Sequence, residues 1–147
     1  MVVRTAYLVL HDQAAAEDVA QEAFTQLLLN WSKIANYERP IAWVRRVAIR
    51  LAVRVARRER LRSTLLGWLE LPREERSADL DLAAAIRSLP PRQRAVVALF
   101  YYEDRPLPEI AELLGCSHST AKVHLFKARR KLAAVLGADH RSFDHVV

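Results

Sequence analysis

The chain has 147 residues, a formal net charge of +6 and a single cysteine, so it can form one ordinary domain or two small ones, without an intramolecular disulfide. It contains only 3 glycines and no useful alternation of apolar and polar residues, which favours an all-α fold. No apolar run is long enough to cross a membrane, and the N-terminus lacks the apolar core of a signal peptide. The composition therefore predicts a cytoplasmic protein without membrane insertion.

The first half of the chain is predicted to form three helices. A short apolar helix spans 2–10, a turn follows at 11–13, and an amphipathic helix spans 14–30. After a loop at 31–40, Pro40 can stand in the first turn of a third helix, about 41–62. The residues expected on the buried sides of the second and third helices are Val19, Ala23, Phe24, Leu27 and Leu28, and Val44, Val47, Ala48, Leu51 and Val55.

Residues 63–80 are predicted to be a linker, because they contain Gly67, Pro72 and a charged run and their helical period is broken. Further helices are expected at 81–88 and 92–102, on either side of Pro90 and Pro91. The tail 138–147 is expected to be frayed. The chain should therefore form two small helical domains, 1–62 and 81–137.

Residues 108–132 have the pattern of a helix-turn-helix. Gly115 can end the first helix because it adopts positive φ readily, and Ser117 or Ser119 can cap the second. One apolar stripe with a 3.6-residue period runs along the second helix: Ala121, Leu125, Ala128 and Leu132. A helix-turn-helix places its second helix in the major groove, so this stretch predicts a DNA-binding protein.

The charge is distributed in blocks along the chain. Residues 39–62 carry nine arginines and one glutamate, and residues 92–137 have a net charge of +4, whereas residues 11–38 and 63–91 are net acidic. Two separate basic blocks indicate two surfaces for a polyanion. A membrane surface would also attract them, but neither block has the apolar face, rich in Trp or Phe, of an interfacial helix.

Three segments together resemble an extracytoplasmic-function (ECF) sigma factor, of the bacterial sigma-70 family of RNA polymerase initiation factors. Region 2.2 of that family is similar to DQAAAEDVAQEAFTQLLLNW (12–31), and regions 2.3 and 2.4 are similar to RPIAWVRRVAIRLAVRVARRERLR (39–62). Region 4 is similar to LPPRQRAVVALFYYEDRPLPEIAELLGCSHSTAKVHLFKARRKL (89–132). The resemblance covers roughly residues 4–136. It implies a promoter-specificity subunit with no catalysis and no cofactor of its own.

The resemblance also implies three contact surfaces. The acidic helix would bind the β′ clamp helices of core RNA polymerase, the arginine-rich helix and the loop before it would bind the −10 element of promoter DNA, and the helix-turn-helix would bind the −35 element. The core-polymerase residues are Asp18, Gln21, Glu22 and Gln26. The −10 residues are Lys33, Asn36, Tyr37, Arg39, Arg45, Arg46, Arg50, Arg54 and Arg57. The −35 residues are His118, Ser119, Thr120, Lys122, Val123, His124, Lys127, Arg129 and Arg130.

Some positions in these segments have more particular expectations. The loop residues of the −10 set would line a pocket for a flipped base, whereas Trp31 and Trp43 are expected in the core. His124 stands where the family frequently has arginine, and a neutral imidazole binds guanine more weakly than a guanidinium does. Family members usually have another helix before the segment VVRTAYLVLHD, so that helix (region 1.2) is expected to be missing here.

Three other functions were compared with this one. A stand-alone LuxR-like helix-turn-helix regulator would not need the arginine helix or the acidic segment. An enzyme is disfavoured because the sequence has no nucleophile–base pairing and no phosphate-cradling glycine loop. A ligand of an anti-sigma factor is compatible with the sigma assignment, since many relatives are held inactive by one. A metal site at Cys116, His118 and His124 is not expected, because no fourth ligand stands at a recognised spacing.

Overall fold

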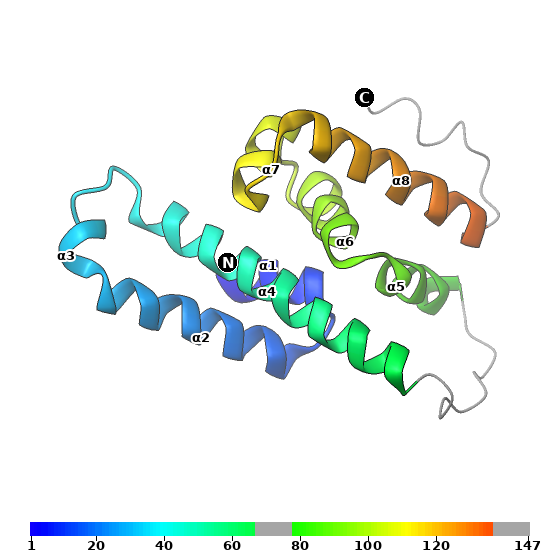
Figure 1. Cartoon of the computed structure of the whole chain (residues 1–147), viewed down its shortest axis with the longest axis horizontal. Helices are drawn as coiled ribbons and strands as arrows, with labels where there is room; N and C mark the ends of the chain where they lie inside the picture. The colour runs from blue at the N-terminus through cyan, green and yellow to red at the C-terminus, as the bar shows by residue number, and fades with distance from the viewer. Residues whose placement is uncertain (67–77, 137–147) are drawn as a thin grey trace.

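The computed structural model describes residues 1–66 and 78–136, which are almost entirely helical (Figure 1). The elements in chain order are α1 (Val2–Leu10), α2 (Gln13–Leu29), α3 (Trp31–Ile34), α4 (Pro40–Leu65), α5 (Ala78–Ser88), α6 (Pro91–Val97), the π-helical segment η2 (Ala98–Tyr102), α7 (Leu107–Leu114) and α8 (His118–Leu136). No strand occurs in these two ranges, in agreement with the predicted all-α fold. None of these helices is long and apolar enough to cross a membrane.

The helix boundaries differ from the prediction mainly around the linker. α4 continues to Leu65, because the first strong helix breaker after Pro40 is Gly67. α5 begins at Ala78, before the predicted start at 81. The rest of the predicted linker, 67–77, and the predicted tail lie outside the described residues. The loop after α2 contains the short helix α3, and the predicted helix 92–102 is divided into α6 and η2.

The turn between α1 and α2 is built by two residues with different tasks. His11 has a left-handed backbone (φ 54°), and its N–H donates to the Tyr7 carbonyl oxygen at 2.7 Å. The Asp12 side chain then caps α2 by accepting a hydrogen bond from the backbone N–H of Ala15 at 3.1 Å. The predicted turn at 11–13 is confirmed.

The first half of the chain (α1 to α4) and the second half (α5 to α8) share one hydrophobic core. In Figure 1, α4 runs between α2 and the pair α6 and α7, with α1 behind it, and it contacts all four helices. Buried side chains from both halves accordingly form a single cluster, whose members in the second half are Ala95, Val96, Leu99, Ile110, Leu113, Leu114 and Leu125. A smaller cluster lies between α5, α6 and α8. A packed hydrophobic cluster therefore joins the two sequence segments predicted as domains.

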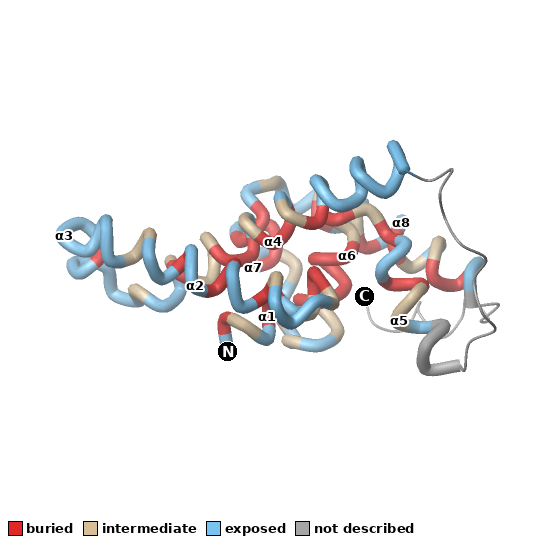
Figure 2. The backbone as a smooth tube through the Cα atoms, turned by 90° about the horizontal axis from the view of Figure 1, so that it is seen from below, coloured by how far each residue is buried: buried red, intermediate tan, exposed pale blue. Residues whose placement is uncertain are grey.

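Two predictions about buried side chains on α2 are wrong. Phe24 and Leu28 are 42% and 74% exposed, because α2 packs on α1 and α4 through a stripe of smaller residues, Ala16, Val19, Ala20 and Ala23. Trp31, predicted in the core, is 51% exposed, whereas Trp43 packs against the core as expected. Figure 2 shows that exposed residues predominate at the α3 end of the molecule, beyond the reach of the second half.

α4 is buried on more of its circumference than a solvated basic helix would be. Val44 and Ala48 are buried as predicted, and Val47, Leu51 and Val55 are partly buried. The second half contacts α4 as well, through α6 and α7, and the further buried residues of α4 are Ile49, Ala52, Val53 and Ala56. This second covered side determines what the arginines of α4 can reach.

Candidate nucleic-acid interface

The joint between α7 and α8 has the geometry that the sequence predicts for a helix-turn-helix. Gly115 ends α7 with φ 69°, and the backbone N–H of Cys116 donates to the Ala111 carbonyl at 2.9 Å. Ser117 caps α8, since its Oγ accepts a hydrogen bond from the Thr120 N–H at 3.1 Å. The predicted stripe is buried: Ala121, Leu125, Ala128 and Leu132 are each at most 4% exposed.

Opposite that stripe, α8 presents a polar and basic surface to solvent. The exposed members of the predicted −35 set are His118, Ser119, Lys122, Val123, Lys127 and Arg130. Their spacing of three and four residues places them on one side of the helix. Thr120 is partly buried, and its hydroxyl lies 2.8 Å from that of Ser117. This side of α8 is therefore free to face a groove of duplex DNA.

His124 and Arg129 lie differently from the other −35 candidates. Both ring nitrogens of His124 are covered and have no hydrogen-bond partner among the described residues. Burial, with the nearby cations Arg92 and Lys127, lowers the pKa of His124. The Arg129 Nε–H donates to the Tyr101 hydroxyl at 2.7 Å, and its guanidinium lies 5.6 Å from the centre of the Phe100 ring. In this conformation both side chains therefore pack against the rest of the chain and do not extend into solvent.

Two of the predicted −10 arginines on α4, Arg46 and Arg50, contact the second half of the chain. Arg50 donates from Nε to the Leu113 carbonyl at 3.2 Å and from Nη2 to the Glu112 carbonyl at 3.4 Å. Arg46 lies 3.6 Å from the Glu112 carboxylate. Because the C-terminal end of a helix carries partial negative charge, α7 is a favourable neighbour for both cations. The sequence pattern indicated the basic face of α4 but not that α7 packs against it.

The other −10 candidates have no such partner among the residues that the structure describes, or a weaker one. Arg54 and Arg57 are exposed, and Arg45 donates from Nη2 to the sulfur of Met1 at 2.9 Å. The four loop candidates, Lys33, Asn36, Tyr37 and Arg39, are all exposed at the end of the molecule that carries α3 (Figure 1). Within that segment only the Ile34 side chain is buried. The structure thus gathers the loop candidates at the N-terminal end of α4.

The predicted polymerase-binding residues lie along one helix. Asp18, Gln21 and Glu22 are exposed on α2, and Gln26 is partly buried and donates to the Glu22 carboxylate at 3.4 Å. Beside them a shallow cavity of about 230 Å³ is lined by the apolar side chains of Ala15, Val19, Leu51 and Val55, together with Asp18 and Glu22. The sequence did not predict this cavity, although the helical period of its apolar residues could have indicated that they share one side of each helix.

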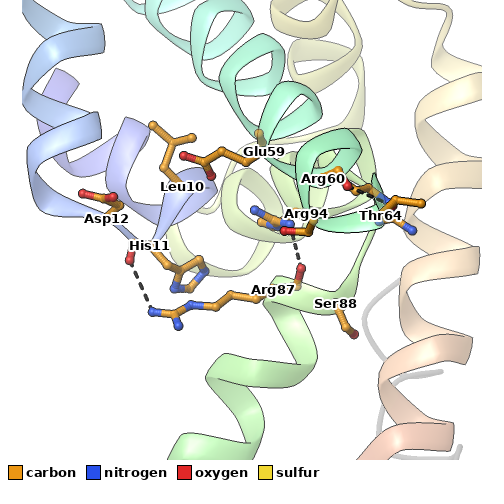
Figure 3. Close-up of a pocket in the computed structure, with 11 residues that line it drawn as sticks. Leu10, His11, Asp12, Glu59, Arg60, Thr64, Arg87, Ser88 and Arg94 are labelled. Carbon is orange, nitrogen blue, oxygen red and sulfur yellow. Dashed lines mark hydrogen bonds between the residues drawn. The ribbon is translucent and has the colours of Figure 1, made fainter. Parts of the chain in front are cut away.

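A buried arginine that sequence reasoning did not single out ties the two halves together. Arg94 is 7% exposed and donates from Nη1 to the Val9 carbonyl at 3.0 Å and from Nη2 to the Arg87 carbonyl at 2.7 Å. Arg87 in turn donates to the His11 carbonyl at 3.3 Å (Figure 3). His11, Arg87 and Arg94 border a cavity of about 610 Å³. Burial and the adjacent cations Arg87 and Arg94 lower the pKa of His11.

Comparisons with known proteins agree with this arrangement. The family descriptions "Sigma-70 region 2" and "Sigma-70, region 4" match residues 1–62 and 79–132. The chain is 28% identical over 129 residues to the RNA polymerase sigma factor SigV of Bacillus subtilis (strain 168), covering 85% of this chain and 78% of that protein. It is 30% identical over 136 residues to the RNA polymerase sigma-E factor of Streptomyces antibioticus, covering 89% of this chain and 76% of that protein.

A solved structure has the same fold. The sigma factor RpoE of Bartonella quintana, in complex with the anti-sigma factor NepR, superposes with a TM-score of 0.67 at 21% identity, covering 94% of this chain and 91% of that one. The chain therefore belongs to the sigma-70 family of RNA polymerase sigma factors, of the ECF type. Sigma factors are transcription initiation factors and are not known as enzymes. The family resemblance stated from the sequence is confirmed, and the LuxR-like alternative is not favoured.

Proposed function

We propose that this protein binds core RNA polymerase through α2 and directs it to promoters whose −35 element is read by α8 and whose −10 element is held by α4 and the loop before it. The observation that carries the proposal is the open polar side of α8 beside a packed helix-turn-helix. It is supplemented by the row of arginines on α4, since guanidinium groups bind phosphate in a forked geometry and also stack on bases.

The −35 candidates on α8 would contact two different parts of DNA, the base edges and the phosphates. Side chains in the first turns, such as Ser119, Lys122 and Val123, would meet base edges in the major groove. Lys127 and Arg130 stand further along the helix and would bind phosphates, which position the protein without reading sequence. His124 would contribute little to base recognition while its ring nitrogens are covered.

The −10 contacts require a rearrangement. Arg50 donates to two carbonyl groups at the end of α7, and Arg46 pairs with Glu112. Both guanidinium groups would exchange these partners for DNA phosphates, so α7 would have to move away from α4 when a promoter is bound. A free chain should therefore bind −10 DNA weakly, and polymerase binding would help to separate the two halves.

Two further parts of the proposal concern partners and place. An anti-sigma factor would be a further partner, by analogy with the NepR complex of RpoE, a protein of the same fold. Because core RNA polymerase and promoter DNA are cytoplasmic in bacteria, this protein would act in the cytoplasm.

The test is transcription by core polymerase with and without this chain. Transcripts from genomic DNA should start at a common promoter sequence only when the chain is added. Replacing Lys127 and Arg130 by alanine should lower promoter binding by about tenfold and reduce the salt dependence by roughly two phosphate contacts. Arg4→Ala, which removes one exposed charge from α1, is the control. Absence of any start site that depends on the chain would contradict the proposal.

A further inference from the structure

A second cavity between the two halves differs from the large one in its charge. It has a volume of about 410 Å³ and is lined by Arg50, Arg54 and Arg57 of α4 and Arg92 of α6. Val53 and the end of α7, at Leu114 and Gly115, complete the wall. None of the described residues that line it is acidic. By contrast, the 610 Å³ cavity contains Asp12 and Glu59 beside its three arginines, so its positive charge is partly offset (Figure 3).

The cations of this smaller cavity are incompletely compensated within the protein. Arg50 is bound by the carbonyl groups of Leu113 and Glu112. The side chains of Arg54, Arg57 and Arg92 make no hydrogen bond or ion pair with any residue that the structure describes. Like charges that face a common hollow repel one another, and an anion placed between them would remove that repulsion.

The spacing of these cations fits a linear anion. Arg50, Arg54 and Arg57 follow one another at steps of four and three residues, so they lie along one side of α4 over about 10 Å. Arg57 also lines an adjoining cavity of about 340 Å³, which Arg60 borders as well. Each guanidinium can donate two parallel hydrogen bonds to a phosphate group. A row of several phosphates would meet one donor group after another.

We infer that this cavity binds a linear oligophosphate, and that the bound anion joins α4 to α6 and stabilises the packing of the two halves. The volume is in the range of small-molecule sites, and the end of α7 closes one side of the cavity. A nucleic-acid strand, which carries a base on every unit, fits such a hollow less well than an unsubstituted phosphate chain. If the proposed function is correct, the ligand would also keep Arg54 and Arg57 from promoter DNA.

Calorimetric titration of the whole chain with sodium tripolyphosphate, at constant ionic strength, tests the inference without polymerase or promoter. We expect one binding site per chain, a rise in the thermal midpoint of unfolding, and much weaker binding of orthophosphate. Arg92→Gln should weaken tripolyphosphate binding by about tenfold, as expected for loss of a charge-assisted contact. Arg4→Gln, which removes an exposed charge outside the cavity, should leave the affinity within about twofold of the unaltered chain.

Equal losses in Arg92→Gln and Arg4→Gln would mean non-specific attraction and would overturn the inference. So would binding of a single-stranded oligonucleotide at this row in the absence of tripolyphosphate binding. Circular dichroism checks that each variant is folded. If Arg92→Gln is not folded, the exposed Arg54→Gln makes the same comparison, and an unchanged affinity in that variant overturns the inference. Because the titration contains neither polymerase nor promoter, its failure would leave the proposed role in transcription untouched.

Discussion

Arg94 illustrates how one side chain can hold two sequence segments together. Its guanidinium reaches the Val9 carbonyl in the first half and the Arg87 and Leu89 carbonyls in the second, at 3.0, 2.7 and 3.3 Å. Hydrogen bonds from a charged donor are stronger than neutral ones, and a buried carbonyl that loses its donor is costly. Arg94 belongs to the RQR motif, which the sequence offered only as a sign of family. In the structure it stabilises the junction.

The two histidines with lowered pKa values predict how stability changes with pH. Burial, with Arg87 and Arg94, lowers the pKa of His11 in the folded chain below 6.5, and the pKa of His124 is lowered as well. As the pH falls below 6.5 the unfolded chain takes up these protons first, so their contribution to stability is complete above that pH. It is lost progressively as the pH falls toward the lower pKa values of the folded chain.

Urea unfolding between pH 7.5 and pH 5.5 measures this dependence. The variant His11→Asn, His124→Gln should lose less stability over that interval than the unaltered chain. Asparagine is chosen because it tolerates the left-handed backbone of His11. Parallel pH profiles for the variant and the unaltered chain would show that neither histidine is responsible.

At the level of the helices, Gly115 has two roles in the joint between α7 and α8. A Cβ at Gly115 would be strained at φ 69°, and it would lie 3.0 Å from Nη2 of Arg50. The arginine is held there by its hydrogen bonds to the end of α7. The same glycine therefore shapes the helix-turn-helix and allows α4 to approach it.

Gly115→Ala should lower the free energy of unfolding by about 1–2 kcal/mol from backbone strain alone. Gly115→Asn should cost less in strain, because asparagine visits the left-handed region more readily. Equilibrium urea unfolding followed by circular dichroism compares the two variants with the unaltered chain. An alanine variant as stable as the unaltered chain would show that the joint can relax at no cost.

At the scale of the whole molecule, the shared core predicts that both halves unfold together. Leu99 is completely buried and belongs to the cluster that also contains residues of α1, α2 and α4. A cavity there should therefore weaken the first half as well as the second, although Leu99 lies in the second.

Leu99→Ala should lower the free energy of unfolding by about 2–5 kcal/mol. Calorimetry should still give one transition, and amide hydrogen exchange in α1 and α2 should accelerate together with exchange in α6 and α8. The control is Leu28→Ala, at a position 74% exposed, which should change stability by at most about 0.5 kcal/mol. Acceleration confined to the second half would mean that the halves unfold independently.

Most of the helices, the helix-turn-helix and the family could be predicted from the sequence alone. These rest on local chemistry: the 3.6-residue apolar period, the positive φ that Gly115 permits and the cap that Ser117 supplies are all read within a few residues. The family followed from three segments whose residues the sequence displays directly.

Only the tertiary structure decided which sides of those helices are covered. Phe24 and Leu28 are apolar yet exposed, and Arg46 and Arg50 are charged yet engaged by α7, because burial depends on what packs opposite a side chain and not on its own polarity. The sequence places His124 among the base-reading candidates, whereas the structure covers both of its ring nitrogens. The same holds for the arginine-lined cavity, whose members from α4 and α6 are brought together only because the two halves share one core.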